Sequence, residues 1–187
     1  MRVALFGGSF DPPHVGHVLA AAYALSVGPF DRVLVVPVLE HAFGKRLSAY
    51  DDRVAMTRLS MERLRDVEVS TVEAHLGTPS RTLGTVRHLT AEHPDWALRL
   101  LIGADVHLER HAWFGYDELE RLAPPFVLGR TGVENGDAPE PLLPPVSSTR
   151  VRQLLTTTDG DRRANPELCR LVPAQVLDYV EERCLYR

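Results

Sequence analysis

A segment near the N-terminus combines residue types that suit the binding of a phosphate group. It follows an apolar run at 2–6 and reads Gly7-Gly8-Ser9-Phe10-Asp11-Pro12-Pro13-His14-Val15-Gly16-His17. Gly7 and Gly8 have no Cβ, so the backbone can turn sharply and present its amides to phosphate oxygens. His14 and His17 are three residues apart and would share one face of the first turn of a helix, whose positive end also attracts anions.

Each of these features also has an ordinary structural explanation. A Gly-Gly pair can be only a turn, and histidines at a helix start can be only caps. A zinc pair is a further alternative, but no third ligand is close in sequence and the metalloprotease glutamate is missing. We interpret Gly16, between the histidines, as leaving room for a nucleoside. The combination directly after the first predicted strand favours a phosphate site.

A second segment with similar chemistry lies far along the chain. It reads Val146-Ser147-Ser148-Thr149-Arg150-Val151-Arg152. Serine is a preferred N-cap, and Arg152 would project from the first turn of the helix that follows. Hydroxyls, amides and a guanidinium would then hold a second phosphate group. Taken alone, the segment is explained equally well as a serine-capped helix with surface arginines.

The elements that position both segments are predicted to be those of an α/β fold. Apolar β-branched runs predict strands at 2–6, 32–37, 67–70, 97–102 and 125–129, and helical periodicity predicts helices at 14–26, 50–65, 81–92, 115–122, 149–156 and 173–183. This alternation predicts a Rossmann-like, doubly wound parallel sheet with flanking helices. Gly and Pro make 131–145 irregular. We expect one domain, 1–187, with a C-terminal helical part at about 147–187. Ligands of such sheets bind beyond the carboxyl ends of the strands.

The composition narrows the functional classes. The formal net charge of −4 argues against a nucleic-acid binder, which needs an excess of Lys and Arg. No apolar stretch is long enough for a membrane span or a signal peptide, so we expect a cytoplasmic protein. Its two cysteines have no CxxC spacing and predict neither a disulfide framework nor a thiolate metal site. The sequence leaves monomer and homo-oligomer open.

The two phosphate-binding segments resemble the paired signatures of the HxGH nucleotidyltransferase superfamily. Leu101-Ile102-Gly103-Ala104-Asp105, Trp113 and Phe126-Val127-Leu128-Gly129-Arg130 are similar to the middle region of bacterial nicotinate-nucleotide adenylyltransferases. The C-terminal Leu185-Tyr186-Arg187 also resembles that family, so the resemblance covers nearly the whole chain. It implies transfer of AMP from ATP to nicotinate mononucleotide, which gives deamido-NAD and pyrophosphate. Mg²⁺ bound to the ATP phosphates is implied as well, without dedicated protein ligands.

The resemblance also implies roles for individual residues. It assigns transition-state stabilisation to His14 and His17, and nucleotide binding to Gly8, Ser9, Phe10, Gly103, Asp105, Ser147, Ser148, Thr149 and Arg152. Residue chemistry adds Gly7 and Gly16 to the expected nucleotide site, and Arg152 and Lys45 to the expected catalytic cations. The acceptor side is implied to include Thr82 and Trp113, and Arg130 is a further ligand candidate because it follows a strand. A basic residue usual after the second strand is missing here, and Lys45 or Arg46 is expected to replace it. Gly77-Thr78-Pro79 departs from the family near the acceptor.

Other charged residues and other functions fit the sequence less well. His107 and His111 are four apart, but without a third ligand we expect no metal there. Arg53 and Arg58 are interpreted as surface charges. The alternatives to the implied function are another acceptor, namely nicotinamide mononucleotide or phosphopantetheine, and a noncatalytic nucleotide sensor. A Rossmann dehydrogenase is disfavoured because no GxGxxG follows the first strand.

Overall fold

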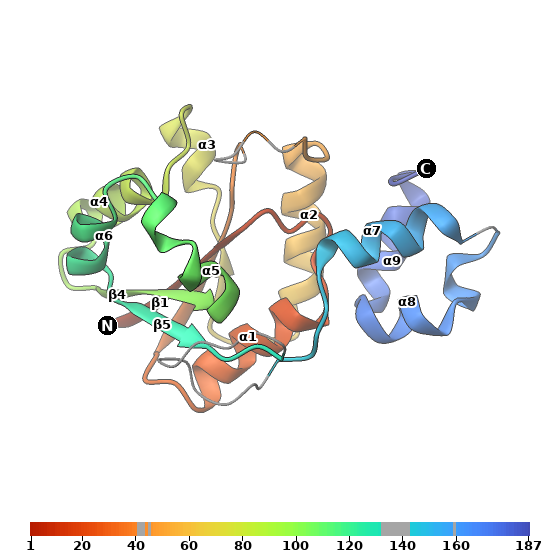
Figure 1. The fold of residues 1–187 in the computed structure, drawn as a ribbon, viewed down its shortest axis with the longest axis horizontal. Coiled ribbons are helices and arrows are strands. Elements are labelled where there is room, and N and C mark those ends of the chain that lie inside the picture. Colours follow the sequence, from red (N-terminus) through yellow and green to blue (C-terminus); the bar gives the residue numbers. More distant parts are fainter. Residues whose placement is uncertain (41–43, 45, 132–142, 159) are drawn as a thin grey trace.

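A single parallel β-sheet organises the chain (Figure 1). The computed structural model describes residues 1–40, 44, 46–131, 143–158 and 160–187. The strands are β1 (Arg2–Gly8), β2 (Arg32–Pro37), β3 (Val67–Val69), β4 (Ala97–Gly103) and β5 (Pro125–Leu128). Their order across the sheet is β3-β2-β1-β4-β5, and every neighbouring pair is parallel. The chain progresses in opposite directions on the two sides of β1, so a crevice is expected at the carboxyl ends of β1 and β4.

Helices cover both faces of the sheet. They are α1 (Val15–Ser26), α2 (Tyr50–Met61), α3 (Val72–Leu76), α4 (Thr82–Glu92), α5 (Ala104–Leu108) and α6 (Tyr116–Leu122), with a 3₁₀ turn η1 (Arg110–Ala112). Alternate strand residues face opposite sides. Val3 and Leu5 of β1 pack with α4 and α6, whereas Ala4 and Phe6 pack with α1. The predicted α/β fold, a parallel sheet with flanking helices, is confirmed.

The C-terminal helices form a third apolar cluster beside the sheet, at the right of Figure 1. These are α7 (Ser148–Thr157), α8 (Pro166–Leu171) and α9 (Ala174–Glu182), with a 3₁₀ turn η2 (Arg162–Ala164). Val151 and Leu155 of α7 pack with Val176 and Val180 of α9, and Met56 of α2 joins the same cluster. This shared core fixes α7 relative to the sheet through α2.

The predicted strands are all present, and the predicted helices differ mainly at their ends. The sequence pattern missed α3, α5 and α8, which are five or six residues long. Such short segments contain too few turns to show a 3.6-residue period. Helix α2 ends at Met61 rather than 65. No helix in the described ranges is both long and apolar enough to cross a membrane.

Candidate active site

The loop after β1 turns at a different residue from the one that the sequence suggests. Gly7 and Gly8 are the last residues of β1 and pair with Val36 and Pro37, so they do not form the predicted sharp turn. The turn falls at Phe10, whose φ of +48° lies in the left-handed region that non-glycine residues rarely adopt. The buried Phe10 ring contacts Gly8, where an added Cβ would lie 3.1 Å from Cζ. Packing of the ring therefore holds the strained backbone in place.

The two histidines stack on each other at the start of α1. Their ring centroids are 3.8 Å apart, and the planes differ by 21°. His14 is the N-cap of α1, and its backbone N–H donates to Nδ1 of His17 at 3.1 Å. A nitrogen that accepts a hydrogen bond carries no proton, so neutral His17 has its proton on Nε2. His17 can therefore donate from Nε2 to a ligand oxygen.

Both histidines are uncharged at neutral pH when no ligand is bound. Burial, followed by the positive charge of Arg130, lowers the pKa of His14 to about 4. Burial lowers the pKa of His17 well below its usual value, and His14 and Arg130 lower it further. An anion placed against the rings would favour the protonated forms again. The pair thus offers hydrogen-bond donors whose charge responds to a bound phosphate.

Gly16 serves packing within the protein, contrary to the interpretation from sequence. A Cβ at this position would lie 2.9 Å from Cγ1 of Val146 and 3.1 Å from the His14 ring. The space beside Gly16 is therefore occupied by the protein itself and is not left for a nucleoside. The missing side chain lets Val146 and the His14 ring approach the first turn of α1 closely.

The structure brings the two sequence segments into direct contact. The Ser148 hydroxyl donates to the carbonyl oxygen of Pro12 at 2.9 Å, and Nη1 of Arg152 donates to that of Asp11 at 2.5 Å. Arg152 also donates to the hydroxyl of Thr149 at 3.2 Å. Ser147 is the N-cap of α7, as predicted, and accepts from the backbone N–H of Arg150. Residues more than 130 positions apart are thus joined beside the start of α1.

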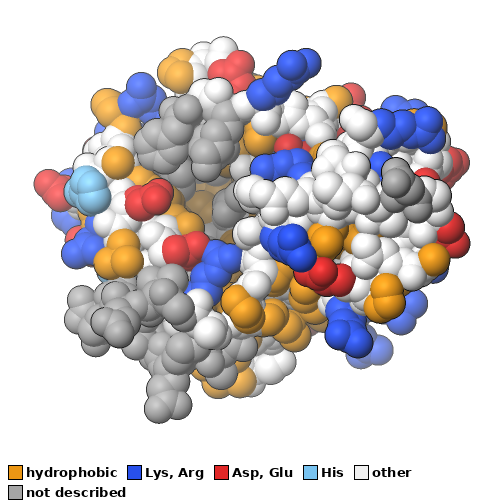
Figure 2. Space-filling model, turned by 45° about the vertical axis from the view of Figure 1, so that its right-hand side comes forward, with side chains coloured by type: hydrophobic (Ala, Val, Ile, Leu, Met, Phe, Trp, Pro, Cys, Tyr) orange, Lys and Arg blue, Asp and Glu red, His pale blue; other side chains and the backbone are white. Residues whose placement is uncertain are grey.

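Arg130 links the ends of β4 and β5 to this contact. Its guanidinium forms an ion pair with Asp105 and donates to the carbonyl oxygen of Val146. Asp105 folds back over Gly103, where an added Cβ would lie 2.5 Å from Oδ1. The positive charge of Arg130 also lowers the pKa of both histidines. Figure 2 shows the surface hollowed between the sheet and the C-terminal helices, with charged side chains at the rim.

Comparisons with known proteins identify the family of the chain. The profile of the cytidylyltransferase-like family matches residues 5–154. A probable nicotinate-nucleotide adenylyltransferase from Anaeromyxobacter sp. (strain K) is 41% identical over 190 residues, covering 100% of this chain and 97% of that protein. One from Chlorobaculum tepidum is 34% identical, covering 100% of this chain and 99% of the relative. The chain belongs to the nicotinate-nucleotide adenylyltransferase family.

Two solved structures with low sequence identity have the same fold. The Plasmodium falciparum nicotinic acid mononucleotide adenylyltransferase complexed with NaAD has a TM-score of 0.83 and 18% identity, covering 99% of this chain and 97% of that one. A putative nicotinate-nucleotide adenylyltransferase from Vibrio parahaemolyticus has a TM-score of 0.73 and 20% identity, covering 100% of this chain and 95% of that one. The Rossmann-like class expected from the sequence is therefore correct.

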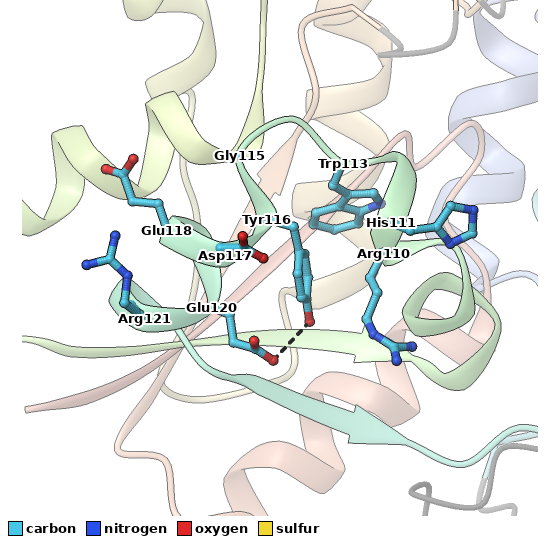
Figure 3. Close-up of a pocket in the computed structure, with 9 residues that line it drawn as sticks. All are labelled: Arg110, His111, Trp113, Gly115, Tyr116, Asp117, Glu118, Glu120 and Arg121. Carbon is cyan, nitrogen blue, oxygen red and sulfur yellow. Dashed lines mark hydrogen bonds between the residues drawn. The ribbon is translucent and has the colours of Figure 1, made fainter.

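The predicted acceptor residues of this family member form a second group around the start of α4. Thr82 begins α4. The next residue, Leu83, packs closely against Gly115 in the loop after Trp113, since a Cβ added to Gly115 would lie only 2.5 Å from Cδ2 of Leu83. Trp113 lines an open cavity of about 800 Å³ between η1 and α6. Figure 3 shows Trp113 on one side of this cavity and charged residues of α6 on the other. The lining of this cavity contains none of the predicted phosphate-binding residues.

Arg53, interpreted from sequence as a surface charge, is buried and binds the backbone of the site. It is 1% exposed. Its guanidinium donates to the carbonyl oxygens of Ser9, Val38, Leu39 and Ser48 at 2.8 to 3.2 Å. The sequence did contain a signal. The buried face of α2 has a helical spacing of three and four residues, and it includes positions 53, 56, 57 and 60. The spacing of Arg53 from Met56 therefore places the arginine on the buried face. Arg58 is exposed, as expected.

Two further buried carboxylates were missed by the sequence analysis. Asp11, 2% exposed, accepts from the Tyr186 hydroxyl and from the backbone N–H of Ser48. Glu73 of α3 is 4% exposed and accepts from the backbone N–H of Leu39 and from the Ser80 hydroxyl. Both stabilise loop backbone, a role that leaves no periodic signal in sequence.

The remaining sequence predictions concern two histidines, Lys45 and the two cysteines. His107 is buried and His111 exposed, and no cluster of three His, Cys, Asp or Glu side chains suitable for a metal occurs among the described residues. Lys45, the predicted basic contact after β2, lies outside the described residues. Cys169 and Cys184 are free thiols on the surface.

Proposed function

We propose that the chain transfers AMP from ATP to nicotinate mononucleotide, forming deamido-NAD and pyrophosphate. The observation that carries the proposal is the meeting of the histidine loop with the Ser147–Arg152 segment, through Ser148 and Arg152. Family membership supports the substrate pair, because the relatives carry the designation nicotinate-nucleotide adenylyltransferase. The substrates are small molecules. The enzyme would act in the cytoplasm, as a monomer or as a homo-oligomer.

The reaction needs positioning rather than an activated side chain. A phosphate oxygen of the acceptor attacks the α-phosphorus of ATP, the bond to the bridging oxygen breaks, and pyrophosphate leaves with the electron pair. The attacking oxygen is already anionic at neutral pH, so no side-chain base is required. The enzyme must align two anions that repel each other and stabilise the charge that develops on the transferring group.

The residues at the start of α1 suit this task. His17 would donate from Nε2 to an α-phosphoryl oxygen, with His14 stacked on it, while the N-terminal end of α1 adds its positive potential. Arg152, anchored on the carbonyl oxygen of Asp11, would contact the phosphates of ATP. Asp105 would share its carboxylate between Arg130 and the nucleotide ribose. In the same proposal Gly7, Gly8 and Ser9 would bind the nucleotide phosphates, and Lys45 would supply a further positive charge.

Mg²⁺ would arrive with ATP. Magnesium usually keeps several waters and binds substrate phosphates, so the proposal needs no cage of carboxylates. When bound, the ion would neutralise part of the charge on the departing pyrophosphate.

The acceptor would lie toward Thr82 and Trp113. The half-buried Trp113 ring offers an aromatic face for the pyridine ring. Its position at the edge of an 800 Å³ cavity leaves space beside that ring.

A pyrophosphate-release assay tests the proposal. The chain is mixed with ATP and Mg²⁺ together with nicotinate mononucleotide, nicotinamide mononucleotide or phosphopantetheine in turn. We expect the highest kcat/KM with nicotinate mononucleotide. A higher value with another acceptor would replace the acceptor assignment. Binding of ATP without release on any acceptor would instead favour a nucleotide sensor.

A further inference from the structure

The C-terminal residues of the chain reach back to the loop that carries the proposed catalytic histidines. The Tyr186 hydroxyl donates to Oδ1 of Asp11 at 2.6 Å, a contact between positions 175 residues apart. Asp11 directly follows Phe10, whose backbone has a φ of +48°. Tyr186 therefore contacts the residue that directly follows the strained Phe10 in the proposed nucleotide loop.

Asp11 connects this loop to several elements at once. Its Oδ2 accepts from the backbone N–H of Ser48 at 3.2 Å, and its own carbonyl oxygen accepts from Arg152 at 2.5 Å. Ser48 in turn accepts from Arg53, which also donates to Ser9 on the other side of Phe10. Among the described residues, Tyr186 is the only side chain that donates a hydrogen bond to the Asp11 carboxylate. Loss of that donor would leave a buried carboxylate oxygen short of a partner.

The protein holds the tyrosine firmly in place. Arg162 is 7% exposed and donates to the carbonyl oxygens of Leu185 and Tyr186 at 3.0 and 2.9 Å. Its Nε also donates to the carbonyl oxygen of Leu155 in α7. Burial, followed by the hydrogen bond to Asp11, raises the pKa of Tyr186, so the phenol remains a donor at all working pH values. A permanent donor on a clamped tail is suited to positioning.

We propose that Tyr186 is a positioning residue for adenylyl transfer: through Asp11 it fixes the Phe10 turn and the anchoring point of Arg152. This inference rests on the proposed function of the loop. Tyr186 itself would not touch the reacting atoms. It would act by keeping the donors of the loop and the guanidinium at the distance that the transition state requires.

The chain contains a matched control. Tyr179 of α9 donates to Oδ1 of the buried Asp52 at 2.8 Å, which is the same pair of groups at a similar distance. That bond joins α9 to α2 and involves no residue of the histidine loop. Tyr179→Phe and Tyr186→Phe each remove one hydroxyl from one tyrosine–aspartate bond. Oδ1 of Asp52 keeps Arg183 as a second donor, so the Tm of each variant is measured together with its kinetics. Only Tyr186→Phe should affect the loop.

The experiment measures steady-state kinetics of both variants with ATP and nicotinate mononucleotide. For Tyr186→Phe we expect kcat to fall about tenfold, the scale of a small misplacement, with the acceptor KM unchanged within about twofold. For Tyr179→Phe we expect kcat within about twofold of the unmodified chain. Equal kcat in the two variants would overturn the positioning role, as would a loss confined to the acceptor KM.

A second measurement needs no turnover. Hydrogen exchange of backbone amides should accelerate in the 7–17 segment of Tyr186→Phe and remain unchanged there in Tyr179→Phe. Unchanged exchange in both variants would refute the proposal. If the unmodified chain released no pyrophosphate, the proposed function would fail, and the exchange comparison would still decide whether Tyr186 holds the loop.

Discussion

The four hydrogen bonds of the buried Arg53 lead to a quantitative prediction about stability. Arg53→Met retains most of the apolar volume of the side chain and removes every donor. The carbonyl oxygens of Ser9, Val38, Leu39 and Ser48 would then lose their guanidinium partner together. Because these carbonyls belong to the loops after β1 and β2 and to the segment before α2, the change acts on the site and on the fold at once.

The expected cost follows from the number of bonds. A hydrogen bond to a charged group contributes about 1.5 to 3 kcal/mol, and relaxation or entry of water recovers part of that loss. If each of the four bonds retains a net value of about 1 kcal/mol, the free energy of unfolding falls by about 4 kcal/mol. For a chain of this length, each kcal/mol lowers Tm by about 2 to 4 °C. We therefore expect Tm to fall by about 8 to 16 °C.

Circular dichroism during thermal denaturation measures this effect, with Arg58→Met as the matched control. Arg58 lies in the same helix and is exposed, so its replacement should change the free energy of unfolding by no more than about 0.5 kcal/mol. Arg53→Lys should recover only part of the loss, because an ammonium group cannot span the same carbonyls as the guanidinium fork. If Arg53→Met and Arg58→Met melted within about 2 °C of each other, the reasoning from the four bonds would be wrong.

Three other predictions concern the proposed site. His17→Ala should lower kcat about 100-fold or more without loss of folding, the scale for a lost transition-state donor, and an unchanged kcat would exclude His17 from the mechanism. Trp113→Ala should weaken binding of nicotinate mononucleotide far more than binding of ATP, as measured by calorimetry; equal losses would refute the stacking assignment. Burial lowers the pKa of His14 from 6.5 to about 4. In the pH window between these two values, the unfolded chain therefore binds one more proton than the folded chain. The free energy of unfolding should therefore fall by up to about 3 kcal/mol as pH drops through it, and urea titrations should show a smaller fall in His14→Gln; an equal fall would contradict the assignment.

The sequence was most informative where a local pattern has one physical cause. Runs such as Arg32–Pro37 are apolar because both faces of a central parallel strand are covered, so all five strands could be located from sequence. The spacing of His14 and His17 placed both rings at one helix start, and the stacking is observed there. The short α5 helix contains too few residues for such a pattern, and it was missed.

Interpretations of single side chains were less successful, because burial depends on neighbours that are distant in sequence. Gly16 was expected to leave space for a ligand, but Val146 occupies that space. Arg53 was expected on the surface, yet its face of α2 is covered by the β1 and β2 loops. In both cases the deciding contact comes from a residue outside the local segment.

The amino-acid sequence by itself determined the α/β class, the strands and the two segments predicted to bind phosphate, because these depend on periodicity and on residue chemistry within short windows. Only the tertiary structure decided that Arg152 is anchored on Asp11, that Arg130 pairs with Asp105, and that Tyr186 donates to Asp11. Those contacts join residues whose meeting depends on the packing of α7 and α9 against α2. No local pattern encodes that packing, since it arises from the combined burial of many apolar side chains.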